Sequence, residues 1–388
     1  QMCIRDSIKT GTVPCHFSID YRIIGIVLTH YLLSRLIFFA GIFAPFMVAN
    51  SGIDVPFPPL EALSESLRKM LDYGDRGWYE SIANAGYSLP DENPKGQKNW
   101  AFFPFLPILI SVLGSHATQN ILGFVVGLGA VLLVAIYTNR RFGRKTAFIT
   151  VTMICYFPFS QSLHLFRPES FMLCFWMLTL LLVGGRLGGV SALFGFIAAL
   201  CKPNGFLISV PLLYRAIRKK APPEFRYSYI ATLAPLLGLL SYSLFTLNLT
   251  GDAFAWSKAQ AAWGSQFMIQ PLHQIKDIFH SPTLIGRWGW DFTPGNVVVF
   301  ISVQIATINL LRRKAYDLAI FLAALSWLSF VNFGFWVQGR HASIMFPYFI
   351  SLALTLQEEV RILVLAIFAG FLGIIGVLSA FQVNAFFV

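Results

Sequence analysis

The stretch NILGFVVGLGAVLLVAIY, from Asn120 to Tyr137, runs for 18 residues without a charged side chain. An apolar run of roughly 18 residues or more is long enough to cross a lipid bilayer as a helix. The chain turns basic directly after it, with Arg140, Arg141 and Arg144 in the next loop. Short loops rich in Lys and Arg mark the cytoplasmic side of a membrane protein. The stretch therefore predicts a transmembrane helix that ends at the cytoplasmic face.

The composition of the whole chain agrees with a membrane environment. Of the 388 residues, 56% are hydrophobic and only 12% are charged. Soluble domains carry about 25% charged residues, so this chain has too little polar surface for a water-soluble globule. The net charge of +11 gathers in short loops between apolar runs, at Arg140, Arg141, Arg144, Lys145, Arg215, Arg218, Lys219, Lys220, Arg312, Arg313 and Lys314. This placement is a topology signal and argues against a nucleic-acid partner.

The remaining apolar runs predict an all-α, polytopic integral membrane protein with about 9–11 transmembrane segments. The first run extends from Ile23 to Val48. The run Phe102 to Leu113 is short and holds two prolines, and at 1.5 Å per residue it is too short for a hydrocarbon core of ~30 Å. We expect it to form a half-inserted or interfacial helix. Further segments are predicted at about 146–163, 170–185, 188–201, 204–216, 227–249, 297–311, 316–333, 342–356 and 361–382.

We expect one membrane domain over residues 21–388. The opening stretch, 1–20, has no clear pattern and no Met at position 1, so it is left out of the fold prediction as a possible non-native or truncated start. Two long loops, at about 50–118 and 250–296, are predicted on the outer face. The multi-pass layout predicts an integral membrane protein with an outward-facing site, and the outer face is topologically equivalent in a bacterial inner membrane and in the ER membrane of a eukaryote.

Unusual polar residues gather at the outer ends of these segments. Arg167, Glu169, Lys202 and Arg340 each lie directly against apolar sequence. A charge within a membrane span costs roughly 2.5–3.5 kcal/mol on insertion scales, so such residues tend to be functional. The alternative, that each one marks a helix end at the lipid headgroups, remains open.

Asp75 is the leading candidate for an acid–base residue. It lies in a turn between Gly74 and Gly77 and precedes Trp78 and Tyr79. Glycosyl transfer from a phosphate donor needs one carboxylate to take the proton of the attacking hydroxyl, and aromatic rings stack on sugar faces. A structural role as the N-cap of a following helix is the alternative. Asp72 and Asp252 are rival candidates for the base.

The cations and neighbouring polar residues suit the rest of such a site. Arg167, Lys202 and Arg340 are candidates for holding a lipid phosphate, because charge-assisted contacts to cations stabilise the departing phosphate. His341 can assist, although a structural role is its alternative. No His, Cys or Asp cluster at metal-ligand spacing is present, and whether a pair of outer acids holds Mg²⁺ or Mn²⁺ stays open. The candidate substrate-binding residues are Trp78, Tyr79, Glu80, Glu169, Asn204 and His341.

At these residues the sequence resembles the PIG-V family of GPI mannosyltransferases, in a shorter, bacterial-type form. The family pattern is a Trp-Asp-Gly-type turn, an Ile-Ala-x-x-Gly-Tyr run and an Asn-x-Ala-Phe-Phe-Pro run. The corresponding segments here are Gly74-Asp75-Arg76-Gly77-Trp78-Tyr79, Ile82-Ala83-Asn84-Ala85-Gly86-Tyr87 and Asn99-Trp100-Ala101-Phe102-Phe103-Pro104. Phe166 to Ser170 and Cys201 to Gly205 resemble two later family segments. The chain departs from the pattern at Gly74, where the family has Trp, and at Arg76, where it has a small residue.

The resemblance implies a GT-C-like helical bundle and an inverting glycosyltransferase. It implies a polyprenyl- or dolichyl-phosphate-mannose donor in place of a nucleotide sugar, and a glycolipid or glycan acceptor. No cofactor beyond the lipid-linked sugar is firmly implied, and a divalent metal stays open. Asp75 is then the general base by analogy with the motif acid of the family. A polytopic transporter or lipid flippase is the alternative function, and a scaffolding membrane subunit is a third.

Overall fold

The computed structural model describes residues 21–49, 75–90, 96–183, 187–218, 226–263, 265, 293–335 and 337–385. Every regular element within these ranges is helical. The first half contains α2 (Tyr21–Ala49), α4 (Arg76–Ala85), η2 (Asn99–Ala101), α5 (Phe105–Leu113), α6 (His116–Phe142), α7 (Arg144–Tyr156), η3 (Ser160–Leu163), α8 (Pro168–Leu182) and α9 (Gly188–Cys201). The second half contains η4 (Pro203–Ile208), α10 (Ser209–Arg218), α11 (Arg226–Thr250), α12 (Ala255–Ala259), η6 (Gln260–Trp263), α14 (Thr293–Arg312), α15 (Tyr316–Phe333), α16 (Gln338–Ala342), α17 (Phe346–Thr355) and α18 (Glu358–Ala385).

The length and hydropathy of these helices confirm the predicted polytopic membrane protein. Within the described ranges, six helices are long and apolar enough to cross a membrane, namely α2, α6, α11, α14, α15 and α18. Three more, α8, α9 and α17, are apolar but shorter. The chain is therefore an α-helical integral membrane protein, with six full-length candidate spans and three shorter helices in the place of the 9–11 predicted segments.

A proline breaks one of the predicted segments, and here the sequence prediction needs correction. The run 146–163 forms α7 and the separate turn η3, because Pro158 forces the preceding residue, Phe157, into an extended conformation with ψ 132°. The run 342–356 corresponds to α17, which begins at Phe346 with Pro347 in its first turn, and α16 ends at Ala342. Irregular backbone after α7 and before α17 therefore lies next to the polar residues considered below.

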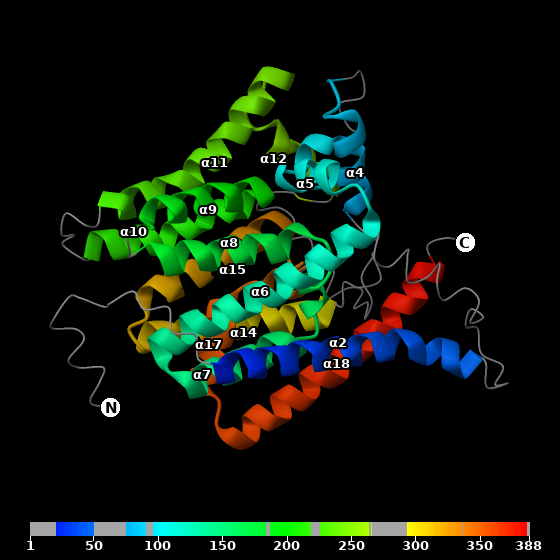
Figure 1. Cartoon of the computed structure of the whole chain (residues 1–388), viewed down its shortest axis with the longest axis vertical. Helices are drawn as coiled ribbons and strands as arrows, with labels where there is room; N and C mark the ends of the chain where they lie inside the picture. Colours follow the sequence, from blue (N-terminus) through cyan, green and yellow to red (C-terminus); the bar gives the residue numbers. More distant parts are fainter. Residues whose placement is uncertain are drawn as a thin grey trace.

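The helices form a bundle in which the two ends of the chain pack together. Figure 1 shows α2 and α18 side by side along one edge, with α6, α8 and α9 layered above them. Close approach of α2 and α18 depends on glycine, because a Cβ on Gly41 would lie 2.2 Å from the carbonyl oxygen of Gly373. Small residues at such crossings let membrane helices gain van der Waals contact. The helices α4, α5 and α12 gather at the opposite end of the bundle from the C-terminus of α10 (Figure 1).

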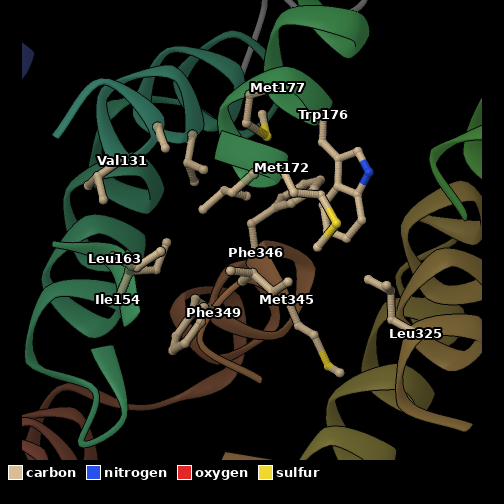
Figure 2. Packing of buried hydrophobic residues seen from close by; sticks show 14 of the residues in the cluster. Val131, Ile154, Leu163, Met172, Trp176, Met177, Leu325, Met345, Phe346 and Phe349 are labelled. Atoms are coloured by element: carbon tan, nitrogen blue, oxygen red, sulfur yellow. The ribbon is translucent and has the colours of Figure 1, made fainter. Parts of the chain in front are cut away.

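The core lies where α8 and α17 face α6 and α15. Figure 2 shows Met172, Trp176 and Met177 of α8 pointing toward Phe346 and Phe349 of α17, and all five side chains are fully buried. The indole Nε1 of Trp176 donates to a backbone carbonyl of η4, at Gly205, over 2.9 Å. Trp176 is therefore both a packing residue and a satisfied polar group.

One shared carboxylate joins three helices at the basic end of the bundle. Asp317, in the first turn of α15, accepts from Arg141 of α6 at 2.6 and 2.7 Å and from Arg215 of α10 at 2.8 Å. Both guanidinium groups also donate to the hydroxyl of Tyr137. Since Asp317 is only 4% exposed, this network fixes the relative positions of α6, α10 and α15 there.

Candidate functional site

Four charged side chains from four separate segments meet at the other end of the bundle. The Nε of Arg340 donates to Glu169 Oε1 at 2.7 Å, and its Nη2 donates to Asp75 Oδ2 at 2.8 Å. Lys202 Nζ donates to the same oxygen of Glu169 at 2.9 Å. We call Asp75, Glu169, Lys202 and Arg340 the Arg340 cluster. All four are predicted site residues, and the structure brings them together.

Exposure differs sharply across the Arg340 cluster. The side chain of Glu169 is fully buried, whereas those of Asp75 and Arg340 are 31% and 29% exposed. Lys202 lies between these values at 19%. The cluster therefore has a buried carboxylate at its inner end, and its solvent-exposed outer edge carries both a carboxylate and a guanidinium.

The first turn of α8 places Glu169 at the base of the cluster. Arg167 is extended (φ −134°, ψ 153°), Pro168 occupies the first turn, and Glu169 follows it. Proline suits this position because its missing N–H would have no partner there and its φ is already helical. A carboxylate in the first turn also faces the positive end of the helix dipole. One oxygen of Glu169, Oε2, has no hydrogen-bond partner.

The segment that leads into α8 is held against α6 by glycines. A Cβ on Gly127 would lie 1.5 Å from the carbonyl oxygen of Leu163, and one on Gly123 would lie 2.7 Å from the backbone nitrogen of Phe166. The two glycines are one helical turn apart, so they form a single smooth strip on α6. Backbone contact along this strip sets the depth at which Arg167 and Glu169 enter the site.

A buried arginine of α2, which was not among the predicted site residues, also holds the same segment. Arg35 lies in the middle of α2 and is 3% exposed. It donates to the carbonyl oxygens of Cys155 and Ser160 at 2.7 and 2.8 Å, and its Nη1 lies 2.6 Å from His164 Nδ1. A charge inside an apolar run signals such a role. Here it satisfies carbonyls at the end of α7.

Arg340 is positioned by the short helix α16. Its neighbour Gly339 lies so close to Phe159 that a Cβ would come within 2.4 Å of the ring. The backbone N–H of Gly339 donates to Asn296 Oδ1 at 2.7 Å. These contacts fix the backbone beside Arg340, and Glu169 then fixes its guanidinium.

Asp75 occupies the N-cap position of α4, but its carboxylate does not cap the helix. Its backbone is helical (φ −72°, ψ −6°), and no side-chain capping bond forms. The carboxylate is directed to Arg340 instead. Burial, the largest influence, raises the pKa of Asp75, but the positive charges of Arg340 and Lys202 and the hydrogen bond from Arg340 outweigh it and lower the pKa below its usual value. Asp75 is therefore an anion at neutral pH.

Arg76 explains how α4 is attached to the bundle. The guanidinium is 5% exposed, and it donates to Gln119 Oε1 and Asn120 Oδ1 of α6 at 2.9 Å each. Its Nε also donates to Glu80 at 2.7 Å. Arg76, one of the two residues at which the chain departs from the PIG-V pattern, is thus a positioning residue for Asp75, and Glu80 is its ion-pair partner.

The aromatic candidates of α4 pack against a neighbouring ring. Trp78 stacks on Phe102 with ring centroids 5.6 Å apart, and Tyr79 meets the same ring edge-on at 5.2 Å. Tyr79 is only 3% exposed. Tyr79 lies close enough to the Arg340 cluster for the charges of Asp75, Glu169 and Arg340 to act on it, and Trp78 is the partly exposed ring.

The other predicted residues lie at varying distances from the cluster. Arg167 is 8% exposed and its charge acts on Glu169. Asn204 is half-buried in η4, two residues after Lys202. Asp252 is paired with Lys258 in an exposed local contact, and nothing in the described residues joins it to the cluster. Asp72 lies outside the described residues.

His341 makes its side-chain hydrogen bond outside the cluster, although the charges of the cluster act on it. Its Nδ1 lies 2.6 Å from Ser329 Oγ of α15. Burial, and then the nearby charges of Lys202 and Arg340, lower the pKa of His341 to about 3. It is therefore neutral at physiological pH and adds no positive charge to the site.

The donor set of the cluster favours an anionic ligand. In the described residues no three His, Cys, Asp or Glu side chains lie where they could hold a metal ion. The four members contain two acids and two bases, and Arg167 adds a further positive charge beside Glu169. A site of this kind can hold one more negative group next to a carboxylate that is able to accept a proton.

Comparisons with known proteins found similarity only to solved structures. No family model matches the chain, and no curated protein matches it. Two solved structures of the Archaeoglobus fulgidus oligosaccharyltransferase align with it, one tethered to an acceptor peptide that contains an NVT sequon and one in complex with Zn and sulfate. The TM-scores are 0.43 and 0.45 at 14% and 15% identity. The alignments cover 92% and 93% of this chain but 55% and 52% of the others, so this chain spans about half their length. At these scores we base no argument on the likeness.

Proposed function

We propose that the protein is a membrane glycosyltransferase that uses a lipid-phosphate-linked sugar as its donor. The observation that carries the proposal is the Arg340 cluster, in which a partly exposed carboxylate, Asp75, lies 2.8 Å from a guanidinium that is anchored on a buried acid. Glycosyl transfer from a phosphate donor needs these two groups side by side, a base for the acceptor and a cation for the leaving phosphate. The PIG-V resemblance at Asp75 supports mannose, or a related hexose, as the transferred sugar.

Residues of this chain supply both the base and the cations that the proposed transfer step needs. The Asp75 carboxylate takes the proton from the acceptor hydroxyl as its oxygen attacks the anomeric carbon of the sugar. The bond from that carbon to the phosphate oxygen breaks, and its electron pair stays on the departing lipid phosphate. Arg340 and Lys202, with the charge of Arg167 behind them, stabilise the negative charge that develops there. Attack opposite to the leaving group inverts the anomeric centre.

The two ends of the bundle support an outward-facing site. The helix α6 has 27 residues and is about 40 Å long at 1.5 Å per residue. Its C-terminal end carries Arg141 in the basic network, whereas its N-terminal end contacts Arg76 next to Asp75. Since basic loops favour the cytoplasm, the Arg340 cluster belongs at the opposite membrane face. This corresponds to the periplasmic side of a bacterial inner membrane or the lumen of the ER.

Transfer of radiolabelled mannose from polyprenyl-phosphate-mannose tests the proposal. Membranes would carry wild type, Asp75→Asn or Asp252→Asn, at matched protein levels. We expect donor-dependent product with wild type and Asp252→Asn, and at least a hundredfold less with Asp75→Asn, since general base catalysis contributes on the order of 10²–10⁴. Equal product from Asp75→Asn would exclude Asp75 as the base. Substrate movement across the bilayer without any transfer product would instead support a transporter or flippase.

A further inference from the structure

The guanidinium of Arg340 binds a buried carboxylate through Nε and a partly exposed one through Nη2. Its Nε is bound to Glu169, which has no exposed side-chain surface, and Lys202 binds the same carboxylate oxygen. Arg340 Nη2 reaches Asp75, while Nη1 has no hydrogen-bond partner among the described residues. An arginine anchored through Nε keeps its position and offers its outer Nη edge to a second anion.

Asp75 is the partner that can leave this edge. Its side chain is 31% exposed, and its only side-chain hydrogen bond within the described part of the chain is the one to Arg340. Ion pairs with such exposure contribute little to stability. Glu169 is held in place by its burial and by two cations. An incoming anion would therefore displace Asp75 before it displaced Glu169.

We propose that the donor phosphate and the Asp75 carboxylate compete for the outer edge of Arg340, so that donor binding releases Asp75 to act as the base. This inference rests on the proposed function. A phosphate matches the guanidinium fork with two parallel hydrogen bonds, which a singly bound carboxylate does not. Once the phosphate is paired with Arg340, it offsets the positive charge that lowers the pKa of Asp75. The carboxylate then becomes a stronger base.

The consequence is an ordered reaction. Before the donor binds, Asp75 is held by Arg340 and accepts no proton from an acceptor hydroxyl. After the donor binds, the carboxylate turns to the acceptor while Arg340 stays on the phosphate. The donor therefore binds first, and an acceptor or a water molecule that arrives early meets no active base. Glu169 is the positioning residue for this exchange, because it keeps Arg340 in reach of both anions.

The test measures binding of undecaprenyl phosphate to the purified full-length protein in lipid nanodiscs, with undecaprenol as the uncharged reference. We expect Asp75→Asn to bind the phosphate about two- to fivefold more tightly than wild type, the range that loss of one weak competing ion pair allows. Asp252→Asn is the matched control, because it makes the same change in an exposed pair outside the cluster, and its affinity should equal that of wild type. Asp75→Ser serves in the same way if the amide variant does not fold.

The outcomes separate this inference from the proposed function. Tighter phosphate binding by Asp75→Asn, with undecaprenol binding unchanged, supports the competition. Affinity equal to or weaker than that of wild type, in a folded and inactive variant, overturns the competition and leaves the glycosyltransferase proposal in place. Failure of wild type to prefer undecaprenyl phosphate over undecaprenol would overturn both.

Discussion

Neutralising the buried carboxylate of the Arg340 cluster gives the sharpest test of how the site is built. Glu169→Gln keeps the shape of the side chain but removes the negative charge that faces Arg340 at 2.7 Å and Lys202 at 2.9 Å. Breaking a fully buried pair costs about 3–5 kcal/mol. Arg340 and Lys202 are 29% and 19% exposed, so water can partly replace the lost contacts. We therefore expect a loss of about 2–3 kcal/mol in the free energy of unfolding.

Unfolding in mild detergent with increasing dodecyl sulfate, followed by tryptophan fluorescence, measures this loss. The matched control is Glu359→Gln, the same change at an exposed position in the first turn of α18, which we expect to shift stability by less than about 0.5 kcal/mol. The double variant Glu169→Gln/Lys202→Gln should lose less than the sum of its two single variants, because each single change leaves the other partner uncompensated. Wild-type stability in Glu169→Gln, or strict additivity in the double variant, would refute the reasoning.

Two further predictions concern packing and protonation. Gly127→Ala should lower the free energy of unfolding by about 1–3 kcal/mol, as overpacking does, because its Cβ would lie 1.5 Å from the carbonyl oxygen of Leu163. Gly129→Ala, with nothing within 4 Å of its Cβ, should be neutral or stabilising in the same unfolding assay, and equal losses would contradict the glycine strip. His341, whose pKa is lowered to about 3, should show no ring titration between pH 5 and 8 by NMR, with His341→Gln assigning the resonance. Because this pKa lies below that of the unfolded chain, His341 should make folding less favourable as pH falls below about 6.5, and a midpoint near 6.5 would contradict its burial.

The family resemblance and the residue chemistry predicted which residues form the Arg340 cluster, but they did not predict how these residues contact one another. Asp75, Glu169, Lys202 and Arg340 were all predicted site residues, and the structure gathers them, although their catalytic and binding roles stay predictions. No geometric feature of the sequence favours Asp75 over Asp252. Only the structure shows that Asp252 pairs locally with Lys258.

The structural roles of Arg35 and Arg76 could not be predicted from the sequence. Arg35 interrupts an apolar run, a signal that was available, but the carbonyls it satisfies belong to a segment about 120 residues away. In the sequence, Arg76 is a departure from the family pattern, which has a small residue at this position. In the structure it holds α4 onto α6 through Gln119 and Asn120.

The sequence by itself determined the membrane class, the approximate bounds of most helices and the end of the bundle at which the members of the Arg340 cluster lie. These properties are local, since a run of apolar side chains is driven into the bilayer and its charged flanks stay at the surface whatever the run packs against. Only the tertiary structure decided which charged helix ends lie next to one another. Arg340 and Asp75 are 265 residues apart, and their contact depends on glycine strips, proline breaks and a buried carboxylate that set the depth and direction of each helix. Pairing across a bundle is a property of packing, which no single segment encodes.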